Sequence, residues 1–277
     1  MAVMIKDRES SVYTSNPEAT SFIKRSEPMN RCFLFCVCVV MVIVVTSVSL
    51  QACGATVVVC GDMGSASLFA GRAVSLGYTT EHWSDPEQVS ALSLVDVDVL
   101  FVHSCFAPYL ASKGSVISSW VAEGHGLIVE QPNQSGNVEM LPPGLEISVF
   151  ANTYDSKMDV QITSLGQTHP ITLGLTTDDL SCNADRVLLA DVSSAYDILG
   201  VQMTNPNYVA LAAAFYGDGR VVFHTGNTSP TSTHPGSDQY VKQMIDWSAG
   251  VPEPSTLALL GIAGLNLLFW RKRRGPN

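Results

Sequence analysis

Four acidic or imidazole side chains, Asp62, His103, Glu130 and His224, each stand at the end of an apolar run that is typical of a β-strand. If those strands are parallel, their carboxyl ends meet at one sheet edge, where open α/β sheets place ligand sites. His224 joins them only if its strand runs the same way. Carboxylates and imidazoles together can exchange protons with a substrate or ligate a divalent metal. The spacing matches no metal motif, and polar residues also cap loops, so both interpretations stay open and no other cofactor is predicted.

Cys105, two residues beyond His103, offers a second chemistry. Its thiolate could act as a nucleophile with His103 or His224 as the base. A cysteine that follows an apolar strand is more often an inert buried thiol. The globular part of the chain holds three cysteines, Cys60, Cys105 and Cys182, so at least one is unpaired within the chain. Cys60 and Cys105 could form one bridge in an oxidising compartment or stay as thiols.

An alternation of strands and helices would position these side chains in the first half of the domain. Strand, helix, strand, repeated, implies parallel pairing with right-handed crossovers. The sequence therefore predicts an α/β fold with a doubly wound, mostly parallel, flavodoxin-like sheet. The expected strands are Thr56–Cys60, Tyr78–Trp83, Val97–Val102 and Gly126–Glu130, and the expected helices are Ser67–Leu76, one starting at Asp85-Pro86-Glu87, and Leu110–Ala122.

The second half is less regular. Tyr216-Gly217-Asp218-Gly219 is a tight turn, so the strands on either side of it are expected to form an antiparallel hairpin, placed at the sheet edge. A helix over Ser237–Trp247 would close the domain. The expected strands here are Leu145–Phe150, Asp159–Ile162, Asp197–Val201, Tyr208–Ala213 and Arg220–His224.

The charge of the globular part excludes one class of partner. Residues 56–250 carry 20 Asp and Glu against 6 Lys and Arg, a net charge of about −14. Such a surface repels phosphate backbones, so nucleic acid is not an expected partner. Solubility outside the cell explains the charge, and binding of divalent cations or cationic polymers is the alternative.

The N-terminal part predicts export. Cys32–Leu50 is a run of 19 residues without a charge, preceded by Arg31 and followed by small residues, as in a secretory signal peptide. Cleavage is the preferred interpretation, although the run nearly spans a bilayer and could be retained as an anchor. Leu50-Gln51-Ala52-Cys53 also resembles a lipobox, in which Cys53 would be acylated and the protein anchored as a lipoprotein.

The C-terminal part has three components in order. Pro252, Glu253 and Pro254 form a stiff, extended segment that a processing enzyme could grip. An apolar stretch, Leu257–Trp270, follows and is expected to be a transmembrane helix. A basic cluster would then hold the end of the chain on the cytoplasmic side by the positive-inside rule. The cluster consists of Arg271, Lys272, Arg273 and Arg274.

This order closely resembles the PEP-CTERM sorting domain. The resemblance implies a substrate of an exosortase, a membrane-embedded, transpeptidase-like enzyme of Gram-negative bacteria that produce exopolysaccharide. It also implies export, a transient inner-membrane anchor, and a final place in the cell envelope, at the outer surface or in the secreted matrix. It says nothing about what the domain does there.

The domain is similar in its order of elements to the class I glutamine-amidotransferase-like superfamily, in its trehalose-utilisation-type branch. The matching pieces are Asp98–Val102, Trp120–Val129, His169–Leu175 and Tyr216–Val222. In active members a nucleophilic Cys sits on a strained turn after the strand that corresponds to Gly126–Glu130. Here Glu130-Gln131-Pro132-Asn133-Gln134 occupies that position. The departure argues against glutamine hydrolysis.

The sequence thus predicts an N-terminal extension and signal at 1–55, an amidotransferase-like domain at 56–250 and a sorting signal at 251–277. The leading functional hypothesis is a non-catalytic binding or interaction module in the envelope, associated with exopolysaccharide. The alternative is an envelope carbohydrate-active hydrolase that uses the strand-end His, Asp and Glu side chains.

Overall fold

The computed structural model describes residues 54–61, 65–103, 105–130, 136–149, 151–180, 182–188, 191–225 and 238–251. The predicted signal, Cys53, Asp62 and the C-terminal sorting segment from Pro252 onward lie outside these ranges. None of the helices in the described ranges combines the length and apolar character that a bilayer crossing needs.

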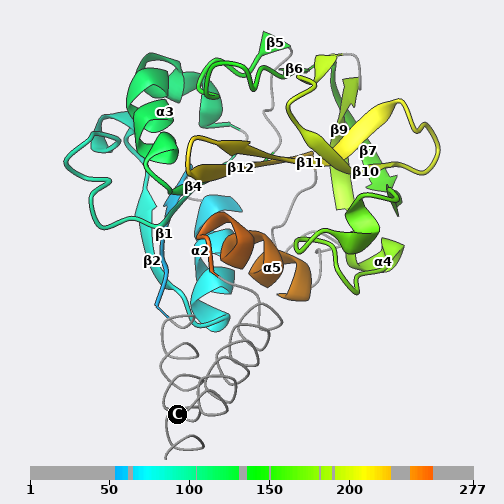
Figure 1. Cartoon of the computed structure of the whole chain (residues 1–277), viewed down its shortest axis with the longest axis horizontal. Helices are drawn as coiled ribbons and strands as arrows, with labels where there is room; N and C mark the ends of the chain where they lie inside the picture. Colours follow the sequence, from blue (N-terminus) through cyan, green and yellow to red (C-terminus); the bar gives the residue numbers. More distant parts are fainter. Residues whose placement is uncertain are drawn as a thin grey trace, which may run out of the picture. The chain divides into compact units, whose positions relative to one another are not determined.

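Five neighbouring strands of the main sheet run parallel, in the order β2-β1-β3-β4-β12 (Figure 1). The central ones are short, apolar and β-branched, and β1, β3 and β4 are buried along nearly their whole length, as expected of strands covered on both faces. The predicted mixed α/β fold is confirmed. The strands are β1 Thr56–Cys60, β2 Thr79–Trp83, β3 Val99–Val102, β4 Gly126–Glu130 and β12 Gly219–His224.

The sheet continues from β12 through antiparallel strands, β11, β10 and β8, and β9 and β7 branch off beside β11. The predicted hairpin exists, but its placement at the sheet edge was wrong, because β12 also pairs with β4 and β11 with β10. The reason is composition: six consecutive residues of β11 are buried, which suits an interior strand. These strands are β7 Ala151–Met158, β8 Val160–Ile162, β9 Cys182–Leu188, β10 Asp197–Gln202 and β11 Tyr208–Tyr216.

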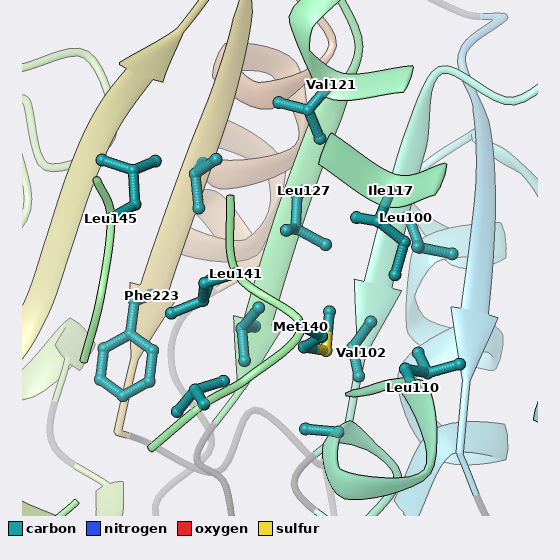
Figure 2. Packing of buried hydrophobic residues seen from close by; sticks show 14 of the residues in the cluster. Leu100, Val102, Leu110, Ile117, Val121, Leu127, Met140, Leu141, Leu145 and Phe223 are labelled. Atoms are coloured by element: carbon teal, nitrogen blue, oxygen red, sulfur yellow. The ribbon is translucent and has the colours of Figure 1, made fainter. Parts of the chain in front are cut away.

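Helices cover both faces of the parallel part. On one face α3 (Gly114–Ala122) packs on alternate strand residues such as Leu100 and Leu127, in the cluster that Figure 2 shows. On the other face α2 (Ser65–Ser75) and α5 (Asp238–Ser248) pack on the residues in between, such as Phe101 and Ile128. The strand period of two therefore sorts the apolar side chains into two cores.

The crossover from β2 to β3 differs from the prediction, because it contains no α-helix. The 3-10 helix η1, Pro86–Gln88, begins at an Asp85 cap as expected and ends after three residues. Ser90 and Ser93 then hydrogen-bond to each other and to nearby backbone, with Ser93 Oγ donating to Ser90 O at 3.0 Å. Such local side-chain bonds compete with helical ones.

Other elements deviate in their bounds. The predicted helix over 110–122 splits into η2, Ala107–Lys113, and α3, where Gly114 packs against the backbone of Glu139. The predicted strand over 145–150 shrinks to β6, Ser148–Val149, which pairs with β5, Gly136–Asn137. A further 3-10 helix, η3, covers Gly166–Thr168, and a short helix, α4, covers Thr177–Leu180.

The parallel strands define two edges of the domain. The amino edge holds the starts of these strands, Thr56, Thr79, Val99, Gly126 and Gly219, and the carboxyl edge holds their ends. Hydrogen bonds tie the amino edge together: Thr56 N donates to Asp98 Oδ2 at 2.7 Å and Gly126 N donates to Asp98 O at 2.9 Å.

Candidate functional site

The strand register brings three of the predicted site residues side by side at the carboxyl edge. Val102 of β3 pairs with Val129 of β4, so His103 follows next to Glu130. Glu130 in turn pairs with His224 of β12, whose strand runs parallel to β4. The strand of His224 therefore runs in the same direction as the others, which the sequence analysis required for His224 to join the site. His103, Glu130 and His224 form one row across three adjacent strands, called here the strand-end row.

The strand-end row is buried and polar. His103 Nε2 lies 3.5 Å from Glu130 Oε2, and both side chains are less than a tenth exposed. His224 is 1% exposed. A carboxylate at this distance can fix the orientation and tautomer of an imidazole, and a charged imidazole would add an ion pair. The pair is thus able to hold a hydroxyl group or a proton at a defined place.

Aromatic rings position the far end of the row. The rings of Tyr240 in α5 and His224 meet at right angles with centroids 6.2 Å apart, and the Phe101 ring centroid lies 6.4 Å from that of His224. Phe101 also stacks on Phe69 of α2. Both helices of that face therefore support the imidazole.

Gly61 allows the near end of the row to form. A Cβ on this glycine would lie 2.5 Å from the Cβ of Ala66 and 3.0 Å from that of His103. Only a residue without a side chain permits β1, α2 and His103 to approach so closely. Sequence reasoning assigned no role to Gly61 or Tyr240. The helical spacing of Tyr240, Val241, Met244 and Ile245 was the one sequence pattern that could have indicated that the Tyr240 ring faces the sheet.

The remaining predicted site residues lie outside the strand-end row. Asp62 is not among the described residues. Cys105 lies in the turn after β3 and is half-buried. Cys60 is a free buried thiol, so it forms no bridge with Cys105. Within the described ranges, no three His, Cys, Asp or Glu side chains are grouped so that they could hold a metal ion.

Burial makes Cys60 a probe of the fold, because it raises the pKa of this thiol to about 12. We expect iodoacetamide at pH 8 to leave Cys60 unmodified in the folded protein and to modify it in urea, as followed by mass spectrometry of its peptide. A raised thiol pKa contributes stability that is complete below the unfolded value of about 8.5 and is lost as the pH rises toward the folded value. Alkylation of Cys60 at pH 8 without denaturant would contradict the packing of β1.

Comparison with known proteins bears first on the C-terminal part. Residues 250–274 match the family model of the PEP-CTERM protein-sorting motif. The chain carries a PEP-CTERM sorting motif. The motif implies an exported protein that is targeted to the cell envelope and processed by an exosortase.

Comparison of the folds bears on the domain. A cytoplasmic protein of Salmonella typhimurium superposes with a TM-score of 0.50 at 11% identity, over 70% of this chain and 98% of that one. A ThuA-like protein of Bacteroides uniformis superposes with a TM-score of 0.51 at 9% identity, over 70% of this chain and 90% of that one. No curated protein matches the sequence. At such identities the likeness shows a ThuA-like fold alone.

Proposed function

We propose that this PEP-CTERM protein is an envelope binding module, whose ThuA-like domain holds a carbohydrate of the exopolysaccharide at its carboxyl edge without turning it over. The strand-end row supports the proposal most directly. It offers an imidazole and a carboxylate 3.5 Å apart at the edge where open α/β sheets bind ligands. A carboxylate accepts and an imidazole donates or accepts hydrogen bonds, which suits sugar hydroxyls.

One observation favours binding over turnover. Gln131 follows Glu130 where active amidotransferases carry their nucleophile, so the residue that would start a covalent reaction is absent from that position. The burial of the row, with 7%, 2% and 1% of the residues' surface exposed for His103, Glu130 and His224, limits binding and turnover alike.

A hydrolase is the second candidate, and one observation favours it. An imidazole beside a carboxylate is the arrangement that a general base uses to take a proton from water. His103 and Glu130 have this arrangement.

Substitution of the row separates the two functions. We expect His103→Ala and Glu130→Gln to weaken retention of the mature protein on exopolysaccharide from the producing cells by about tenfold to a hundredfold, since a hydrogen bond to a charged group contributes about 1.5–3 kcal/mol. Affinity electrophoresis would measure retention, and circular dichroism would verify folding. Glu130→Gln keeps the shape of the side chain and removes its charge. His103→Ala instead leaves the buried Glu130 carboxylate without the imidazole beside it, which is costly.

Met203 supplies the matched control, because it is half exposed after β10 and lies outside the row. Met203→Ala should bind like the parent protein. Unchanged binding by folded His103→Ala would refute the site. Release of reducing ends by the parent protein but not by Glu130→Gln would establish the hydrolase instead.

A further inference from the structure

Both ends of the described domain lie at its amino edge. At the start, Ala55 O accepts from Thr79 N at 3.2 Å, beside the first residues of β1 and β2. At the end, Trp247 O of α5 accepts from the Arg220 guanidinium. A Cβ on Gly126 would lie 2.5 Å from Ser248 O, so the last turn of α5 rests on the start of β4. The chain therefore enters and leaves the domain on the side opposite the strand-end row.

The segment that follows α5 is short. The sorting motif begins at Gly250, two residues after the end of α5 at Ser248. Eight residues, 249–256, separate α5 from the apolar stretch that starts at Leu257. Fully extended, they reach at most about 28 Å. A compact domain of about 200 residues has a radius of gyration of roughly 16 Å and is therefore about 40 Å across. The tether is too short to pass around the domain.

Exposed apolar side chains also gather at the amino edge. Leu92 and Val95 lie in the loop that leads into β3, Val74 lies at the end of α2, and Phe215 lies beside the β11–β12 turn. Each is more than half exposed. The Phe215 ring packs edge-on against the Trp247 ring, with centroids 5.6 Å apart, and Cζ of Arg220 lies 5.6 Å from the Phe215 centroid. The ring is thus held outward next to the point where the chain leaves α5.

We propose that the amino edge is the membrane-facing surface of the tail-anchored protein, so that the strand-end row points away from the lipid. The proposal rests on the PEP-CTERM motif and goes beyond the binding function, since it concerns which edge the envelope exposes. The orientation follows from the tether and is assisted by the apolar side chains. Asp96, Glu123 and Asp218 near the same edge outnumber Arg220 there, so electrostatic attraction to anionic lipid is not its cause.

Lipid-depth quenching tests the orientation in the full chain. A fluorescent amino acid would be incorporated at Val95 or Phe215 on the amino edge, and at Tyr109 or Met203 on the carboxyl edge. All four positions are about half exposed or more, so each tolerates the probe. The protein would be measured in inner-membrane vesicles from cells without exosortase, which keep the tail, with lipids that carry a spin label at the headgroup.

We expect quenching at Val95 and Phe215 to be several-fold stronger than at Tyr109 and Met203, and to be unaffected by salt. Equal or reversed quenching in membrane-bound protein would overturn the orientation and leave the binding function untouched. Recovery of all four variants from the soluble fraction would refute the membrane anchoring on which the proposal rests. Sugar binding of the same variants in detergent distinguishes either failure from a failure of the binding site.

Discussion

Replacement of Pro252, Glu253 and Pro254 by alanine is expected to stop processing, so that the full-length protein accumulates in the inner membrane with its basic end attached. Two prolines restrict the backbone and remove two donors, a combination that favours an extended segment to which an enzyme could bind. Three alanines would instead favour a helix continuous with the apolar stretch. The change removes both the restricted backbone and the carboxylate that a processing enzyme could recognise.

The measurement is the mass of the protein in membrane and medium fractions, before and after the change. Glu253→Gln, which keeps the backbone and removes the charge, separates the role of the prolines from that of the carboxylate. Pro142→Ala is the matched control, because Pro142 lies within the domain and outside the motif. If the triple variant were processed at the parent rate, the motif would not be the recognition element.

The largest effect on folding is expected from Gly219→Ala. A Cβ at this position would overlap the carbonyl oxygen of Val121 and lie 2.5 Å from that of His125. Both are backbone atoms in or just after the last turn of α3, so no rotamer change relieves the clash. Overpacking of this kind costs about 3 kcal/mol or more. For a domain of this size the midpoint of thermal unfolding should fall by roughly 6–12 °C.

Gly71→Ala is the control for this variant. Gly71 lies in α2 and is exposed, and a methyl group added there would meet no atom within 4 Å outside the backbone of its own helix. Alanine at such a helical site should stabilise by about 0.5–1 kcal/mol. Differential scanning calorimetry of both variants tests the pair. A Gly219→Ala midpoint within 2–3 °C of the parent value, which corresponds to about 1 kcal/mol, would show that α3 and the β11–β12 turn are not in contact as described.

The strands could be predicted more closely than the helices. β1 and β4 have the predicted bounds, because a short apolar, β-branched run that is ended by Gly or a charged residue strongly favours a β-strand of that length. The crossover after β2 could not be predicted, because serine side chains compete with helical hydrogen bonds over a few residues. β7 and β9 were missed since their sequences, Ala151–Met158 and Cys182–Leu188, interleave polar and charged residues without an apolar run.

The meeting of His103, Glu130 and His224 at one edge of the sheet could be predicted in part from the sequence, but the arrangement of their strands could not. That His103 and Glu130 would be neighbours followed from parallel pairing of consecutive strands. The place of His224 depended on β12 inserting next to β4, a long-range pairing that no local pattern encodes. The same pairing moved the hairpin from the edge into the sheet, so one unpredictable contact accounts for both outcomes.

The eight residues between α5 and the apolar stretch also limit the distance over which one membrane-anchored molecule could reach a polysaccharide chain. A tether of at most about 28 Å would let an anchored domain move over the membrane by only about its own width. On the proposed binding function and membrane anchoring, two polymer strands would be joined only where two copies are immediate neighbours. Cross-linking of a matrix by such a protein would depend on its surface density more steeply than on its affinity for a single chain.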